Sequence, residues 1–162
     1  MARNDVALRK AETIFNELDE LRTAISRRAY DLFRKRGNPW GSPLTDWLNA
    51  EQQLVWRPAI ELRQKDRQFE VLAATPGVEA KDLDVEITPE DMLIKAGIHH
   101  KHTPEEGAVQ VCEFTAGQLF RSVHFPEKVD PDSAKAEYRN GMLRVTASIA
   151  KPAAQKVEIT AG

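Results

Sequence analysis

Cysteine and long apolar runs are nearly missing from this sequence. Its single cysteine, Cys112, excludes an internal disulfide and is typical of a reducing compartment, so a cytoplasmic location is expected. The longest purely apolar run, residues 71–74, is far shorter than the roughly 20 residues of a membrane helix. The first residues also lack the apolar stretch of a secretory signal. We therefore expect neither a membrane span nor export.

An excess of charge of one sign is absent too. The chain has 23 basic and 25 acidic residues, with a net charge of -2, so neither nucleic acid nor an anionic membrane is expected as a partner. No glycine-rich phosphate-binding loop of the Gly-x-x-x-x-Gly-Lys-Ser/Thr kind occurs. We therefore expect no nucleotide and no other cofactor.

Residues suited to catalysis or metal binding are few. Cys112 and His124 are a conceivable nucleophile and base, but nothing in the sequence orients the imidazole or supplies an oxyanion site. His99, His100 and His102 are the only clustered metal candidates. In a strand, neighbouring residues point to opposite faces, so only His100 and His102 could share an ion, and no thiol or carboxylate is assigned beside them. We expect no enzyme and no metal site.

Residues 5–36 contain no proline or glycine, and their apolar side chains recur at intervals of three and four. This spacing predicts one long amphipathic helix, ended by Gly37 and Pro39. Its apolar face could cover the chain's own domain or stay available to partner subunits and clients. A second short helix is predicted from Pro43 to about Val55, with Ser42 as its cap.

From residue 59 onward the apolar period changes to two, the spacing at which side chains alternate between the faces of a sheet. Eight short strands are predicted, at about residues 60–62, 69–74, 83–87, 92–99, 109–114, 119–125, 134–139 and 142–149. Asn140-Gly141 is a strong hairpin signal between the last two. No long helix interrupts the strands, so an all-β antiparallel sandwich is expected and a parallel sheet is disfavoured.

Four motifs in this β-rich segment resemble the alpha-crystallin domain of small heat-shock proteins. Residues 136–143 (Ala-Glu-Tyr-Arg-Asn-Gly-Met-Leu) are similar to the family signature Ala-x-x-x-Asn-Gly-Val-Leu. Residues 69–77 resemble the family's apolar strand that ends in Leu-Pro-Gly, and residues 82–87 (Asp-Leu-Asp-Val-Glu-Ile) follow them as in the family. Residues 119–126 resemble its Phe-x-Arg-Ser-Phe-x-Leu-Pro strand, which places Arg121 at the characteristic arginine. Residues 28–51 also look like a helical module of uncharacterised bacterial proteins.

The resemblance implies an all-β, immunoglobulin-like antiparallel sandwich over residues 56–151. A helical N-terminal arm over residues 1–55 would precede it, and a short C-terminal extension over residues 152–162 would follow. The implied function is that of an ATP-independent chaperone, a holdase that covers the apolar surface of unfolding client proteins. It would assemble from homodimers into larger homo-oligomers. The alternative is a co-chaperone or adaptor on a related sandwich that binds one folded partner.

The resemblance also implies a docking site between subunits. Val157-x-Ile159 is similar to the family's Ile-x-Ile/Val tail motif and is expected to dock in a neighbouring subunit. The expected docking site is an open groove lined by Leu83, Val85, Ile87, Ala134, Ala136 and Tyr138.

A dimer interface and a client surface are implied as well. Arg121 is expected to form an ion pair across a dimer interface, with a sheet-face charge as the alternative. Val109 and Val111 are expected in a strand that pairs with the other subunit, with a simple surface hairpin as the alternative. The candidates for client contact, each of which could instead pack within its own chain, are Phe15, Leu18, Leu32, Phe33, Trp40, Trp47 and Leu54.

Overall fold

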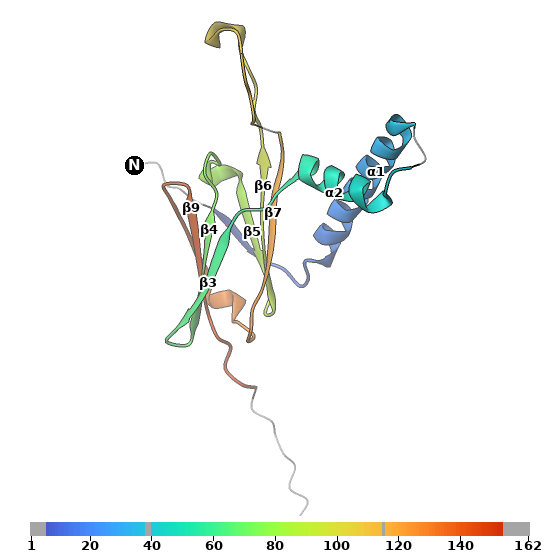
Figure 1. Cartoon of the computed structure of the whole chain (residues 1–162). Helices are drawn as coiled ribbons and strands as arrows, with labels where there is room; N and C mark the ends of the chain where they lie inside the picture. The colour runs from blue at the N-terminus through green and yellow to red at the C-terminus, as the bar shows by residue number, and fades with distance from the viewer. Residues whose placement is uncertain (1–5, 38–39, 115, 154–162) are drawn as a thin grey trace, which may run out of the picture.

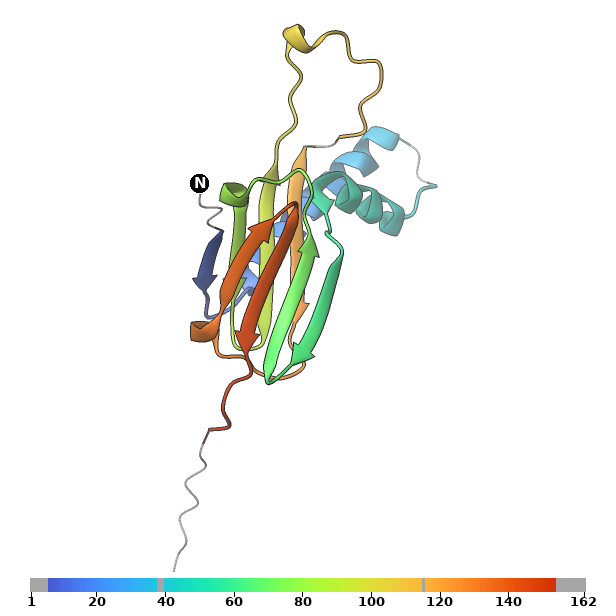
Figure 2. The ribbon, with the colours of Figure 1, turned by 90° about the vertical axis from the view of Figure 1, so that its left-hand side faces the viewer.

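The alternation of apolar and polar residues places the core between two stacked β-sheets. This computed structural model describes residues 6–37, 40–114 and 116–153, and in that part of the chain the sheets face each other with two helices to one side (Figures 1 and 2). The first sheet consists, in order, of β3 (Ile60–Lys65), β4 (Gln68–Ala74), β9 (Met142–Ser148) and β8 (Lys135–Arg139). Each neighbouring pair in it is antiparallel.

The second sheet is antiparallel at its centre and parallel at both edges. Its strands, in order, are β1 (Ala7–Lys10), β5 (Leu83–Ile87), β6 (Asp91–Ile98), β7 (Gly117–His124) and β2 (Val55–Trp56). The short edge strands β1 and β2 run parallel to β5 and β7. The helices are α1 (Phe15–Arg36) and α2 (Pro43–Leu54), and the 3-10 turns are η1 (Ala80–Asp82), η2 (Pro104–Glu106) and η3 (Pro131–Ser133).

Side chains from both sheets form a closed core. Phe69 stacks on Phe125 with ring centroids 5.7 Å apart, and Val71, Leu119 and Leu143 are each at most 1% exposed. Full burial of one such side chain contributes about 1.5–3 kcal/mol. No residue of α1 or α2 belongs to this cluster within the described chain, so the sandwich has a core of its own.

The turn between β8 and β9 has the geometry that its sequence predicts. Asn140 and Gly141 have φ values of 53° and 76°, the positive values that a two-residue hairpin turn requires, and Arg139 pairs with Met142 across it. A Cβ at residue 141 would also lie 3.2 Å from the Cα of Pro76. Glycine is therefore favoured there by its positive φ, and the space beside Pro76 is tight for a larger residue.

The predicted long helix is wrong over residues 6–14. The apolar spacing predicts a helix from residue 5, but α1 begins at Phe15, and Ala7–Lys10 form β1 instead. Residues 4 and 5 lie outside the described residues. The free edge of β5 offers backbone hydrogen bonds that outweigh local helix preference, and β1 takes them up over four residue pairs. The helix ends as predicted, with Gly37 in the left-handed conformation at φ 61°.

The helices form an antiparallel pair, the helical arm, that leans against the sandwich. α2 begins at Pro43 after Ser42, as predicted, and ends at Leu54. Ile25 and Ala50 are buried in the pair, and Arg36 donates to Asp46 at 2.8 Å. At the base of α1, Ile14 packs with Leu93 and Phe120 on the outer face of the second sheet. Neither described helix is long and apolar enough to cross a membrane.

Seven of the eight predicted strands are present among the described residues, and the one predicted at residues 109–114 is not. The segment between Ile98 and Gly117, here called the β6–β7 loop, projects beyond the end of the sandwich and contains only η2 as regular structure in its described part (Figures 1 and 2). A strand needs a neighbour to pair with, and one subunit offers this segment none.

Candidate partner-binding surfaces

The edge of β5, where the sequence predicts an open docking groove, is covered by the chain's own β1. Ala7–Lys10 pair with residues 84–87, and the amide of Ala11 donates to the carbonyl of Ile87 at 2.9 Å. Val6 and Leu8 pack against the sandwich core from this side. The expectation that this edge stands open is therefore corrected, because a strand from the same chain occupies it.

The residues predicted to line the groove fall into two groups. Leu83, Val85 and Ile87 are at most 1% exposed and belong to the core rather than to a surface. The other group, Ala134, Ala136 and Tyr138, lies half-buried at or beside β8, which is the edge of the facing sheet. The hydroxyl of Tyr138 donates to the carbonyl of Val78. β8 has no further strand beside it in the described chain, so it is an edge strand, as β1 is in the other sheet. The two edge strands lie on the same side of the sandwich (Figure 2).

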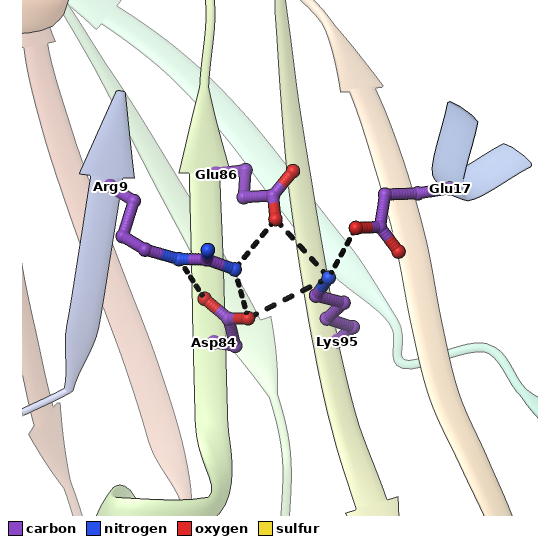
Figure 3. A network of polar contacts seen from close by, with 5 residues as sticks. All are labelled: Arg9, Glu17, Asp84, Glu86 and Lys95. Atoms are coloured by element: carbon purple, nitrogen blue, oxygen red, sulfur yellow. Dashed lines mark hydrogen bonds and ion pairs between the residues drawn. The ribbon is translucent and has the colours of Figure 1, made fainter. Parts of the chain in front are cut away.

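A network of ion pairs holds β1 and the start of α1 to the sheet (Figure 3). The guanidinium of Arg9 donates to Asp84 through Nε at 3.1 Å and Nη2 at 2.6 Å, and Nη2 also donates to Glu86 at 2.7 Å. Lys95 Nζ lies 2.8 Å from Glu17 and 3.1 Å from Glu86. The network therefore joins β1, β5, β6 and α1 across the outer face of the sheet.

Lys95 stands at the centre of this network with a side chain only 13% exposed. Burial, the largest single influence, disfavours its charge, but hydrogen bonds to Glu17 and Glu86 together with their charges outweigh burial. The pKa of Lys95 consequently lies above its usual value. The pKa of Arg9 is also raised, first by its hydrogen bond to Asp84.

The predicted tail motif, Val157 and Ile159, lies outside the described residues. The described chain leaves the sandwich after β9, where Ile149 bridges to Val129, and residues 151–153 are exposed.

Arg121 lies in β7 with a half-buried side chain. It lies two residues from both Leu119 and Val123, whose side chains enter the core, so it shares their face of the sheet. Its Nε is buried and has no hydrogen-bond partner in the described part of the chain. A buried guanidinium nitrogen normally has a partner.

The β6–β7 loop carries exposed apolar side chains. Val109, Val111 and Phe114 are 49%, 81% and 76% exposed. β3 is the edge strand of the first sheet opposite β8. Among the described strands it pairs only with β4, so the edge of β3 that faces away from β4 is open. The loop thus exposes Val109 and Val111, in a molecule whose described strands also include the unpaired edge of β3.

The candidates for client contact divide between exposed and packed positions. Phe15, Phe33 and Trp40 are exposed, at 68%, 50% and 90%. Leu18 packs against the cluster at the base of α1. The other three candidates, which are half-buried, are Leu32, Trp47 and Leu54. Tyr30, Leu44 and Leu48, which are not among these candidates, are exposed as well.

The histidines and the cysteine are arranged differently from the sequence-based expectation. β6 ends at Ile98, so His99, His100 and His102 lie in the loop. Their side chains therefore need not point to alternate faces as they would in a strand. Cys112 lies beside His100 and His102. His124 contacts Asp91 at 2.8 Å at the other end of β7, roughly 23 Å of strand from the loop, so it forms no pair with Cys112.

In the described part of the chain, two sheet edges are open and the helical arm carries exposed apolar side chains beside a closed sandwich. Comparison with known proteins gives the class. The model of the Hsp20/alpha crystallin family matches residues 61–160, more than half of the chain. A second model, described as a protein of unknown function (DUF2934), matches residues 20–55, which contain most of the helical arm. The chain belongs to the Hsp20/alpha crystallin family of small heat-shock chaperones.

Individual relatives agree with this assignment. A probable 15 kDa heat shock protein of Leptospira interrogans is 28% identical over 73% of this chain and 89% of its own length. The alpha-crystallin of Mycobacterium tuberculosis is 31% identical over 62% of this chain and 69% of its own. Heat shock protein 16.0 of Schizosaccharomyces pombe has a similar fold, with a TM-score of 0.55 over 76% of this chain and 96% of its own, at 22% identity.

Proposed function

We propose that this chain is an ATP-independent holdase that binds unfolding proteins through exposed apolar side chains and keeps them from aggregating. It acts in the cytoplasm, assembles from homodimers into larger homo-oligomers, and uses neither a catalytic step nor a nucleotide. The family assignment supports the chaperone class, and the following features of the chain support the finer mechanism.

The distribution of apolar surface carries the proposal. The sandwich buries its apolar residues almost completely, whereas Phe15, Phe33 and Trp40 of the arm and its connection remain 50–90% exposed. Large exposed apolar groups that cluster on one part of a molecule are typical of interaction sites. Covering them with the apolar segments of an unfolding chain removes both surfaces from water and needs no energy input.

Dimer formation is proposed through the β6–β7 loop. Val109 and Val111 are two residues apart, so in an extended segment they point to the same side. The open edge of β3 in a second subunit can accept such a segment as an added strand. Arg121, whose buried Nε has no partner in the described chain, then gains an acidic partner from the other subunit.

Larger assemblies are proposed through the tail. Val157 and Ile159 of one chain dock at the β5 and β8 side of another, and there they displace β1. Val6 and Leu8 have the same spacing of two as Val157 and Ile159, so the two segments compete for similar contacts. Burial of two such side chains is worth roughly 3–6 kcal/mol before ordering costs, so each contact is reversible.

Heat-induced aggregation of an unrelated protein, measured by light scattering without ATP, tests the holdase. We expect suppression at near-stoichiometric ratio, because coverage of the client needs about one chaperone surface per unfolding chain. The triple variant Phe15→Ser, Phe33→Ser, Trp40→Ser should suppress aggregation several-fold less well.

The matched control is Met142→Ser, which removes an exposed apolar side chain from the sandwich instead of the arm. It should suppress aggregation like the unchanged protein. The proposal fails if the unchanged protein gives no suppression, or if the triple variant retains its helices and β-sheet and still suppresses fully. A stable monomer in light scattering would favour the adaptor alternative.

A further inference from the structure

The β6–β7 loop brings together three metal-binding side chains that are separate in the sequence. One imidazole nitrogen of His100, one of His102 and the Sγ of Cys112 all lie within 4.8 Å of one another. His100 and His102 are on the outgoing arm of the loop, and Cys112 is on the returning arm. All three are exposed, so an ion can reach them directly from solvent.

The turn between the arms explains why they meet. Pro104–Glu106 form η2, the backbone amide of Thr103 donates to the carboxylate of Glu106 at 3.4 Å, and Gly107 follows at φ 93°. At this positive φ, with ψ at -177°, the backbone has a conformation that glycine adopts without strain, and the chain turns back around η2 (Figure 2). The returning arm is therefore directed toward the histidines by local sequence.

Aromatic contacts also link the two histidine rings to each other and to the returning arm of the loop. The ring of His100 stacks on Phe114 with centroids 4.7 Å apart, and the ring of His102 meets His100 edge-on at the same distance. The Sγ of Cys112 lies 3.8 Å from the carbonyl oxygen of Phe114. Phe114 thus contacts both one histidine and the cysteine, and it limits the space that these ligands can occupy.

We propose that the β6–β7 loop binds a zinc ion through His100, His102 and Cys112. Imidazole nitrogen and thiolate sulfur are the donors that zinc prefers, at about 2.0–2.1 Å and 2.3 Å. A tetrahedral ion with these bond lengths requires ligand atoms roughly 3.3–3.6 Å apart, so rotation of exposed side chains from their present separation suffices. Three protein ligands leave the fourth position to water.

Zinc binding would join the two arms of the loop and restrict residues 103–111 between them. This segment includes Val109 and Val111, so the ion would order the part of the chain proposed above for dimer contact. The proposed zinc site depends only on its three ligands, and it does not depend on whether Val109 and Val111 contact a second subunit.

Cobalt(II) spectroscopy of the full chain, with a non-thiol reductant present, tests the ligand set. We expect one ion per chain and a thiolate-to-cobalt absorption band that zinc abolishes by displacement. Cys112→Ser should lose the band. His100→Ala and His102→Ala should each weaken zinc binding by at least about tenfold. Loss of a residue that only supports a metal ligand already costs about this much affinity, so loss of a ligand should cost no less.

His99→Ala and His124→Ala are the matched controls, because each removes a histidine outside the cluster. Both should bind zinc within about twofold of the unchanged protein, since neither residue is among the three proposed ligands. Absence of the thiolate band, equal weakening by His99→Ala, or one ion per two chains would each overturn the intrachain site.

Limited proteolysis gives a second readout that does not depend on spectroscopy. Lys101 lies between the two histidines, is exposed, and offers trypsin a cleavage site. Zinc should slow cleavage after Lys101 and a chelator should restore it, whereas cleavage after exposed Lys81 should not respond. Equal cleavage after Lys101 with and without zinc at saturating concentration would contradict the proposal.

Discussion

At the scale of single residues, Lys95 concentrates the electrostatic stabilisation of the sheet's outer face. It lies within ion-pair distance of Glu17 on α1 and of Asp84 and Glu86 on β5. Glu86 is only 8% exposed and shares its carboxylate between Lys95 and Arg9. Loss of the lysine would leave these acidic groups close together with one cation fewer.

Replacing Lys95 by methionine should destabilise the protein by roughly 1.5–3 kcal/mol at neutral pH, the contribution of hydrogen bonds to charged groups. Because the folded-state pKa of Lys95 is raised, its contribution is fully present below the unfolded value of about 10.4 and is lost as the pH rises through the folded value. Denaturant unfolding should therefore show a gap between the two proteins that narrows above about pH 10.4.

Lys81→Met provides the comparison, because Lys81 pairs with Glu79 at 2.9 Å but both side chains are at least 70% exposed. It should leave the free energy of unfolding almost unchanged, because solvent screens an exposed ion pair. If Lys95→Met were equally mild, or if its gap widened with pH, the network would not stabilise the fold.

At the scale of elements, the positions of most strands could be predicted from the sequence, but the pairing of β1 with β5 could not. The period of two and the Asn140-Gly141 turn locate seven strands, and Pro43 after Ser42 locates α2. The prediction missed β1 because no proline or glycine separates residues 7–10 from the helical spacing that begins at Ile14. The predicted helix was therefore extended backwards over the strand. Residues 7–10 form a strand because β5 has an edge with which they can pair. This long-range contact cannot be predicted from the local sequence pattern.

The β6–β7 loop illustrates the same limit for a site. His100 and His102 can be found in the sequence as a pair, but Cys112 joins them only because Gly107 and the turn before it reverse the chain. The predicted strand at residues 109–114 has apolar alternation but no partner within one subunit. Contacts that depend on a turn or on another chain cannot be read from spacing alone.

The pairing of β1 with β5 yields a prediction about competition. In a chain whose own tail is disabled by Val157→Ser and Ile159→Ser, the further change Leu8→Ser should weaken β1. A peptide of residues 152–162 should then bind roughly tenfold more tightly, because burial of a leucine is worth about 1.5–3 kcal/mol.

Isothermal titration measures this difference, and a peptide with both Val157→Ser and Ile159→Ser should not bind either chain. Equal peptide affinities with and without Leu8→Ser would mean that β1 and the tail do not compete.

At the scale of the whole molecule, the main core of the sandwich is separate from the helices and from the β6–β7 loop, which are proposed to contact other chains. The core cluster contains residues of neither α1 nor α2, and the β6–β7 loop projects beyond the sheets (Figure 1). Changes at the loop, the arm or the tail should therefore alter assembly while leaving the β-domain intact.

Replacing Val157 and Ile159 by alanine should shrink the oligomer without unfolding the β-domain, because the tail contact between subunits loses most of its buried apolar surface. Size-exclusion chromatography with light scattering measures the mass, and circular dichroism checks the fold. Lys156→Ala with Thr160→Ala is the matched control and should keep the mass. An unchanged mass after loss of both apolar side chains would remove the docking role.

If the tail of another copy competes with β1 as proposed, the covered β5 edge makes assembly depend on the concentration of the protein. A strand tethered in the same polypeptide competes at an effective concentration that dilution does not alter, whereas a segment from a separate copy competes at the concentration of that copy. Dilution should then favour self-capped subunits, and accumulation should favour linked ones. The threshold between these two regimes would be set by how firmly Arg9 and Leu8 hold the first strand in place.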